Sequence, residues 1–479
     1  MKRGSGTLGV IVRYASSNFY RQILGLITAF LRPKLLAPEA FGLWSLFAVI
    51  PTYASHLHLG TRATMRFQVP ELTSRGEADG VERLKGAVYR GSLFVYAAAA
   101  LALALGALAP GLEIDERVAL VLSAVTVLVG WHYEFHISLL KGRSRFGLVG
   151  RSNMILATTL FLSTVVLIPL WGVEGAFIAV TASWLLTALL LARNGGVEPI
   201  GPFHGPTFRR AVRTGLPIML FDLVGLGLRN GDKLLVAALL GKTQLGYYGL
   251  AAMVTGALMN IPGVSREVTE PQLMASLQHT GPRDTYARFL RRPLLTTALL
   301  MPLLIGPVHL ALEPCILLLL PDYQPGLEST RILTLATYFL ALVYPTRGVL
   351  VAFGWQGRAV WAGAAVIAVN ATLSWLLIRQ GYGLPGVAWS NCAAFLVLLI
   401  LLLGLLLPRF ALNTREWGGL LLGIGMPFVI MIGALQGSLL LGSHWSAGHP
   451  HWGPVIALAL YLPVAACGAL AAWWLHKRS

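Results

Sequence analysis

Apolar stretches of membrane-spanning length follow one another along nearly the whole chain, and short polar loops separate them. A helix that crosses the ~30 Å hydrocarbon core of a bilayer needs about 20 mostly apolar residues. The segments that meet this requirement are 8–31, 41–60, 87–109, 117–140, 152–171, 173–192, 211–238, 244–265, 293–312, 329–350, 359–378, 384–407, 417–441 and 453–475. We therefore expect an all-α polytopic membrane protein with fourteen transmembrane helices.

The loops between these segments alternate in their basic content. With the N-terminus placed in the cytoplasm, most of the 37 Lys and Arg residues fall in inner loops and few fall in outer loops. Basic residues collect on the cytoplasmic side of membrane proteins, so the alternation predicts that both termini lie inside (N-in/C-in). No loop is long enough to hold an extramembrane catalytic domain.

Composition agrees with this picture and excludes other classes of protein. The chain is 56% hydrophobic and only 12% charged, with a mean hydropathy of +0.69. A soluble surface needs roughly a quarter of its residues charged, so a soluble enzyme is excluded. The net charge of +17 follows from the basic inner loops, and we expect no nucleic-acid partner. Three cysteines scattered through apolar runs cannot form a disulfide framework or a thiolate metal site.

Two sequence patterns occur twice, about 200 residues apart. Leu36-Ala-Pro-Glu-Ala-Phe-Gly-Leu-Trp-Ser-Leu46 is similar to Leu240-Gly-Lys-Thr-Gln-Leu-Gly-Tyr-Tyr-Gly-Leu250, and Trp171-Gly-Val-Glu-Gly-Ala176 is similar to Tyr382-Gly-Leu-Pro-Gly-Val387. The repeat predicts two six-helix lobes of equal orientation, residues 1–200 and 201–407, joined by a Gly- and Pro-rich linker over 193–213. Residues 408–479 then add two helices. Parallel repeats imply a substrate site between the two halves.

The same segments resemble a known family. The pattern at 36–46 is followed by Leu59-Gly60, Arg66-Phe67 and Arg75-Gly76-Glu77, and the second half adds Gly215-Leu-Pro217, Asp232-Lys233-Leu234 and Ile261-Pro262. In this order they resemble the polysaccharide-transport proteins, the O-antigen (Wzx-type) flippases of the multidrug/oligosaccharidyl-lipid/polysaccharide (MOP) exporter superfamily.

The resemblance implies a V-shaped, two-lobe transporter that is not an enzyme and needs no cofactor. Its substrate would be an undecaprenyl-diphosphate-linked oligosaccharide, such as the O-antigen repeat unit of lipopolysaccharide or an exopolysaccharide repeat unit. It would move this lipid from the cytoplasmic to the periplasmic leaflet of the bacterial inner membrane by alternating access. A polysaccharide polymerase and chain-length proteins are the implied protein partners.

Charged residues inside the predicted spans are the candidates for substrate binding, because each costs about 2.5–3.5 kcal/mol to insert. Arginine binds phosphate groups bidentately, which suits the diphosphate of such a lipid. The expected ligands in a cationic central cavity are Arg13, Asn18, Arg21, Arg66 and Arg229. Arg21 lies about 20 Å along its helix from Leu8, near the membrane midplane.

Two aspartates are candidate coupling groups or counter-charges. Asp222 and Asp232 both fall in the predicted span 211–238, and Asp222 matches Arg21 in depth on the repeat-related helix. Arg21 and Asp222 could alternatively form a buried structural pair that holds the lobes together. We expect no metal site, because His132 and His136 share a helix face but lack a third ligand.

Other functions remain open at this point. A lipid II flippase belongs to the same superfamily and is the nearest alternative. A multidrug or cation antiporter needs a cavity dominated by carboxylates, whereas the deep charges here are mainly arginines. A membrane glycosyltransferase or polymerase is disfavoured because it usually needs a sizeable outer loop with acidic residues. No P-loop pattern is present, so ATP hydrolysis by this chain is not expected.

Overall fold

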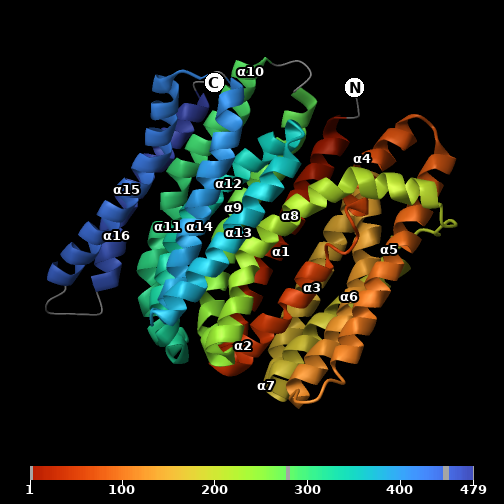
Figure 1. Ribbon diagram of the computed structural model, residues 1–479, viewed down its shortest axis with the longest axis horizontal. Helices are drawn as coiled ribbons and strands as arrows, with labels where there is room; N and C mark the ends of the chain where they lie inside the picture. The colour runs from red at the N-terminus through yellow and green to blue at the C-terminus, as the bar shows by residue number, and fades with distance from the viewer. Residues whose placement is uncertain (1–3, 277–280, 411, 446–452, 478–479) are drawn as a thin grey trace. The chain divides into compact units, whose positions relative to one another are not determined.

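The structure is a computed structural model that describes the backbone of residues 4–276, 281–410, 412–445 and 453–477. Within these ranges, the side chains of residues 4–15, 261, 264–276, 282, 445 and 475–477 are outside the description. The described residues form helices joined by turns and short loops, with no strand among them (Figure 1).

The first half of the chain is helical from α1 to α8. The bounds are α1 (Gly4–Leu35), α2 (Pro38–Phe47), α3 (Val49–Ala54), α4 (Thr61–Ser74), α5 (Ala78–Gly106), α6 (Ile114–Gly142), α7 (Phe146–Arg193) and α8 (Gly205–Leu240). The second half contains α9 (Lys242–Ser276), α10 (Pro282–Thr285), η1 (Tyr286–Arg291), α11 (Arg292–Leu319), η2 (Pro321–Gly326), α12 (Leu327–Ala352), α13 (Gln356–Arg379), α14 (Gly383–Leu406), η3 (Leu407–Phe410), α15 (Thr414–Trp445) and α16 (Gly453–Lys477).

Ten helices in the described part of the chain are long and apolar enough to cross a membrane. The predicted class, an all-α multi-pass membrane protein, is therefore confirmed. One of the ten, α7, contains two predicted spans, 152–171 and 173–192, which a kink at Trp171 and Gly172 separates. The count of fourteen and the orientation of the termini stay predictions.

The two copies of the second repeated pattern fold in the same way. Gly172 and Gly383 follow the aromatic residue of each copy, and each has a φ of 53°, a conformation that glycine adopts without strain. The last glycine of each copy, Gly175 or Gly386, has no room for a Cβ, which would lie 2.0 Å from the carbonyl of Leu167 or 2.9 Å from the Cβ of Leu377. The pattern therefore encodes a tight reversal between two closely packed helices.

The first repeated pattern also behaves alike in both copies. Its third residue, Pro38 or Lys242, is the first residue of a helix, α2 or α9. Pro38 suits this place because the first turn of a helix does not use its amide hydrogens. Both copies of this pattern therefore begin a helix, and the division into two repeat lobes stays a prediction.

The prediction of one uninterrupted helix over 41–60 is wrong. The segment contains α2 and α3, and the chain then leaves helical conformation before α4. Leu59 and Gly60 have positive φ values of 53° and 78°, which no right-handed helix accommodates. A Cβ on Gly60 would lie 2.1 Å from the carbonyl carbon of Gly215, so this break packs backbone against backbone on α8. Hydropathy alone did not reveal it.

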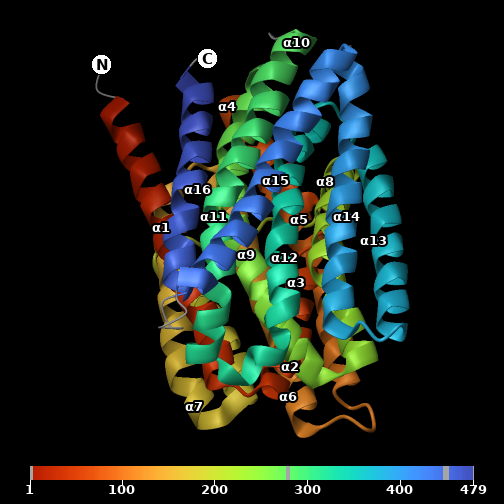
Figure 2. The ribbon, with the colours of Figure 1, turned by 90° about the vertical axis from the view of Figure 1, so that its left-hand side faces the viewer.

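The chain divides into two compact units, Met1–Leu226 and Gly227–Ser479. In the first unit α7 packs along α1 and α6, and α6 packs against α5 and α4 (Figure 1). In the second unit α12 packs against α9, α11 and α14, while α15 and α16 pack against α11 (Figure 2). Residues 205–226 of α8 belong to the first unit, whereas the lobe boundary predicted from the repeat lies at residue 200.

The connection between α7 and α8 spans residues 194–204, which is only part of the predicted linker. Ion pairs attach it to the rest of the first unit. The carboxylate of Glu198 lies 3.0 Å from the buried Lys85 Nζ and 2.8 Å from Arg143 Nε. We call these three residues the linker clamp. Arg90 adds a hydrogen bond from its Nε to the carbonyl of Gly201 at 3.0 Å. At the start of α8, Ala211 packs in a hydrophobic cluster with residues of α4 and α5.

Candidate functional site

A polar pocket of about 190 Å³ lies in the first unit, at the break between α3 and α4. It has room for roughly six water molecules at ~30 Å³ each. Its lining consists of Ser55, His56, His58, Arg62, Ala63, Arg66, Glu134, Ser138, Lys141, Met219 and Asp222. We call this the break pocket.

Helical spacing explains how the side chains of three helices converge on the break pocket. Residues three, four or seven positions apart lie on one face of a helix. The lining has this spacing on α4 (Arg62 and Arg66), on α6 (Glu134, Ser138 and Lys141) and on α8 (Met219 and Asp222). The hydroxyl of Thr64 on α4 donates a hydrogen bond to the carbonyl of Ala211 on α8 at 2.8 Å, which ties two of these helices together.

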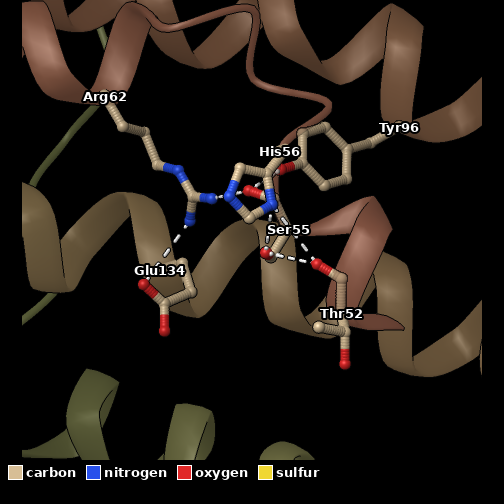
Figure 3. A network of polar contacts seen from close by, with 6 residues as sticks. All are labelled: Thr52, Ser55, His56, Arg62, Tyr96 and Glu134. Atoms are coloured by element: carbon tan, nitrogen blue, oxygen red, sulfur yellow. Dashed lines mark hydrogen bonds and ion pairs between the residues drawn. The ribbon is translucent and has the colours of Figure 1, made fainter. Parts of the chain in front are cut away.

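Arg62 is held at the break by its neighbours (Figure 3). Its Nη2 donates a hydrogen bond to the carbonyl of Ser55, and its Nη1 lies 3.4 Å from Glu134 Oε2. The carbonyl is available because the helix ends here, and carbonyls at the end of a helix lack an intrahelical partner. The hydroxyl of Tyr96 donates to the same carbonyl at 3.3 Å. The broken helix thus supplies the acceptor that orients the guanidinium group.

Two histidines stabilise the non-helical segment. Nδ1 of His58 accepts a hydrogen bond from the backbone N–H of Gly60 at 2.9 Å, so this nitrogen carries no proton and the ring is neutral. The hydroxyl of Thr61 donates to the carbonyl of His58 at 2.6 Å. The His56 ring stacks near the His58 ring with centroids 6.4 Å apart, and its Nδ1 lies 3.0 Å from Ser55 Oγ. The backbone of the break is therefore ordered by side-chain hydrogen bonds.

The charges of the break pocket suit an anion. Its lining has three cationic groups, Arg62, Arg66 and Lys141, and two carboxylates, Glu134 and Asp222. Both arginines can bind phosphate oxygens through paired N–H donors, a geometry that a lysine cannot supply. Among these five groups there is a surplus of one positive charge, which a bound phosphate group would neutralise.

The predicted substrate ligand Arg66 and the predicted counter-charge Asp222 both line the break pocket. Arg21 is exposed on α1 and lies outside this lining in the described part of the chain. Asn18 accepts a hydrogen bond on Oδ1 from Asn153 Nδ2 of α7 at 3.3 Å, which joins α1 to α7. The side chain of Arg13 falls outside the described residues.

The remaining two predicted residues lie in the second unit. Arg229 is exposed on α8 and donates from Nη1 to the hydroxyl of Tyr344 on α12 at 3.1 Å. Asp232 is buried, with 5% of its surface exposed. Its Oδ2 accepts from the Tyr248 hydroxyl at 2.5 Å and from Asn391 Nδ2 at 2.9 Å, while Oδ1 accepts from the backbone N–H of Lys233 at 2.9 Å.

Asp232 is one member of a larger buried polar network. Asn391 Oδ1 accepts from Asn370 Nδ2 at 3.1 Å, Ser390 donates to Asn370 Oδ1, and the hydroxyls of Ser374 and Ser390 lie 2.5 Å apart. We call this set, with Tyr248, the Asp232 network. It joins α8, α9, α13 and α14 in the second unit. Hydrogen-bonding groups are costly to bury unless they are paired, and here they satisfy one another.

Sequence reasoning missed most of these groups. Arg62 and Lys141 lie just beyond the ends of the predicted spans 41–60 and 117–140, and His56 and His58 lie in a span predicted to be continuous. The signals were Pro51 followed by Leu59-Gly60 within one apolar segment, and polar residues four apart in the span that contains Asn370 and Ser374. Among the described side chains, no group of three or more His, Cys, Asp or Glu residues could hold a metal ion.

Comparisons with solved structures identify the fold. A structure of the lipid II flippase MurJ in an inward closed conformation matches with a TM-score of 0.68 and 14% identity, covering 94% of this chain and 98% of MurJ. An inward-facing multidrug resistance MATE family transporter of the MOP superfamily matches with a TM-score of 0.63 and 14% identity, covering 84% of this chain and 98% of the transporter. A MOP superfamily transporter from Pyrococcus furiosus matches with a TM-score of 0.52 and 14% identity, covering 84% of this chain and 95% of that chain.

These neighbours are transporters and flippases, not enzymes, and they share the fold of this chain at low sequence identity. A search of curated protein sequences finds no match. The sequence profile of a family described as polysaccharide biosynthesis protein matches residues 33–323, which is more than half of the chain. This match covers the break pocket and the start of the Asp232 network. The chain belongs to the polysaccharide biosynthesis protein family.

Proposed function

We propose that this protein is a flippase that moves an undecaprenyl-diphosphate-linked oligosaccharide across a membrane. The cargo is an O-antigen or exopolysaccharide repeat unit, and it passes from the cytoplasmic to the periplasmic leaflet of the bacterial inner membrane by alternating access. The proposal includes fourteen membrane helices with both termini in the cytoplasm. Membership of a polysaccharide biosynthesis family supports the cargo class, and the likeness to MurJ and MATE transporters supports the mode of action.

The observation that carries the proposal is the break pocket with its three cations. Buried or membrane-embedded arginines are costly unless they bind something. A lipid-linked diphosphate offers several anionic oxygens in a compact group, which Arg62, Arg66 and Lys141 are placed to share. Arg13, Asn18, Arg21 and Arg229 remain in the proposal as further polar ligands along the path of the substrate. No cofactor is part of this mechanism.

Asp232 is the proposed coupling group, and Asp222 is the proposed counter-charge of the break pocket. A buried carboxylate that accepts hydrogen bonds from three donors can hold a charge or take up a proton. A change in its charge would alter a network that joins four helices, which offers a way for an ion gradient to drive conformational change. Asp222 faces the same pocket as two arginines and offsets part of their charge.

The test is to deplete the protein in its host and identify the lipid-linked intermediate that accumulates in the inner leaflet. We expect the undecaprenyl-diphosphate repeat unit of a surface polysaccharide to accumulate and its polymer to disappear from the surface. Wild-type protein should restore export and Arg66→Gln should not. Arg75→Gln is the matched control, because Arg75 forms an exposed pair with Glu71 at the end of the same helix. Unchanged lipid intermediates after depletion would refute the flippase assignment.

A lipid II flippase is the second candidate, since the MurJ structure covers nearly all of this chain. The same experiment separates the two candidates, because lipid II would then accumulate and peptidoglycan synthesis would stop. A multidrug or cation antiporter is disfavoured by the excess of cationic groups in the break pocket. If the protein were such an antiporter, its depletion would make cells more sensitive to organic cations and would leave the amounts of lipid-linked glycans unchanged.

A further inference from the structure

We propose that Glu134 acts as a stand-in for phosphate: it pairs with Arg62 while the break pocket is empty, and the substrate diphosphate displaces it. This inference rests on the proposed function, since it assigns a role to a residue of that same pocket. Glu134 would then determine how tightly the diphosphate binds and how readily it leaves.

The Arg62–Glu134 ion pair is looser than the other ion pairs of the described residues. Its N–O distance is 3.4 Å, whereas the others lie between 2.6 and 3.0 Å. Charge-assisted hydrogen bonds between guanidinium and carboxylate are typically about 2.7–2.9 Å long. The Arg62–Glu134 contact therefore contributes little as a hydrogen bond and is easily replaced by a better acceptor.

The two partners are not equally free to move. Arg62 has 12% of its side-chain surface exposed, and its Nη2 is bound to the carbonyl of Ser55. Glu134 has 38% exposed, and among the described residues its only ion pair is the one with Arg62. An incoming anion can therefore displace the carboxylate while the guanidinium keeps its position. A binding group that is already in place loses less entropy when its ligand arrives.

The chemistry of the exchange favours a diphosphate. Arg62 Nη1 gives up one distant carboxylate oxygen and gains phosphate oxygens, while Arg66 and Lys141 lie on the same pocket to bind the rest of the anion. When the diphosphate leaves, Glu134 returns to Arg62. The Arg62 guanidinium thus keeps an anionic partner both before and after the diphosphate binds. A transporter gains from this because it must release its cargo as well as bind it.

The experiment measures the binding of inorganic diphosphate to the purified full-length protein by isothermal titration calorimetry. Glu134→Gln keeps the shape of the side chain and removes its charge, so the variant should bind about three- to fivefold tighter, the range of an exposed ion pair. Arg62→Gln should bind more weakly. Adding Glu134→Gln to Arg62→Gln should then have no effect, because the pair no longer exists. Undecaprenyl diphosphate in nanodiscs should compete with inorganic diphosphate for the same site.

Controls separate this role from general electrostatics and from misfolding. Glu71→Gln removes an equal charge from an exposed ion pair on α4 and should leave binding unchanged. Glu134→Asp keeps the charge on a shorter side chain and should tighten binding less than Glu134→Gln does. Thermal unfolding of each variant shows whether it is folded. For substrate transport, Glu134→Gln should lower the turnover rate and also lower the substrate concentration needed for half-maximal rate.

Two outcomes would overturn the inference. If wild-type protein binds diphosphate, Arg62→Gln does not, and Glu134→Gln binds like wild type, then Glu134 only links α4 to α6. If Glu134→Gln tightens binding equally in the Arg62→Gln background, its effect is general electrostatics. Failure of every form to bind diphosphate would refute this inference and the proposed function together.

Discussion

Asp232→Asn tests whether the Asp232 network couples ions to transport. The amide has nearly the shape of the carboxyl, but one of its two ends is an NH₂ group that cannot accept a hydrogen bond. With the amide oxygen in the place of Oδ2, the bonds from Tyr248 and Asn391 persist and the bond from the Lys233 N–H is lost. With the reverse orientation two bonds are lost, so the first arrangement is preferred.

The expected cost follows from that single lost bond. Lys233 lies inside α8, so its N–H keeps an intrahelical acceptor, and the lost bond costs about 0.5–1.5 kcal/mol, the net contribution of a typical hydrogen bond. Total stabilities of folded domains are about 5–15 kcal/mol, so the variant should fold and insert with a lowered unfolding temperature. Tyr248→Phe is the matched variant, because it also removes one hydrogen bond to the carboxylate but leaves the ionisable group. Asp322→Asn, at an exposed aspartate, should not change stability.

The two network variants should differ in transport. Asp232→Asn should lose glycan export and any response to an imposed ion gradient, whereas Tyr248→Phe should retain both at a reduced level. Thermal unfolding in detergent and export of a labelled glycan measure the two properties separately. If Asp232→Asn unfolds at the wild-type temperature, the hydrogen-bond reasoning is wrong. If it exports glycan at the wild-type rate under every gradient, Asp232 is structural and the coupling group lies elsewhere.

Three further predictions concern the first unit and the topology. Gly60→Ala should destabilise the protein by more than the ~1–2 kcal/mol that a left-handed backbone costs a residue with a Cβ, because this Cβ would also lie 2.1 Å from the backbone of α8. Gly76→Ala is the control: Gly76 has a φ of 73°, and a Cβ there would meet no atom within 4 Å, so thermal unfolding should show the backbone strain alone. Glu198→Gln should weaken the linker clamp and lower the free energy of unfolding by about 1–3 kcal/mol, and a denaturation curve like that of wild type would contradict the clamp. Cysteines at positions 74 and 443 should be labelled only from the cytoplasm and only from outside, respectively; labelling of 443 from the cytoplasm would contradict the fourteen-helix topology.

The sequence alone determined the class of the protein and its family. Apolar segments of about 20 residues must be helical in a bilayer, because no other single-segment structure satisfies the backbone there. The family followed from short local patterns, such as Leu59-Gly60, where both residues have a positive φ. The sequence also identified Asp222 and Asp232 as unusual, since a charge in an apolar span is visible without any structure.

Only the tertiary structure decided which of these charges come together. The break before α4 depends on the close approach of Gly60 to Gly215 of α8, and hydropathy does not report contacts between residues so far apart in sequence. The break brings Arg62 to the carbonyl of Ser55 and, across to α6, near Glu134. The Asp232 network likewise needs four helices to meet in the second unit. Pairing between distant side chains depends on helix packing, and packing is a property of the folded chain rather than of any single segment.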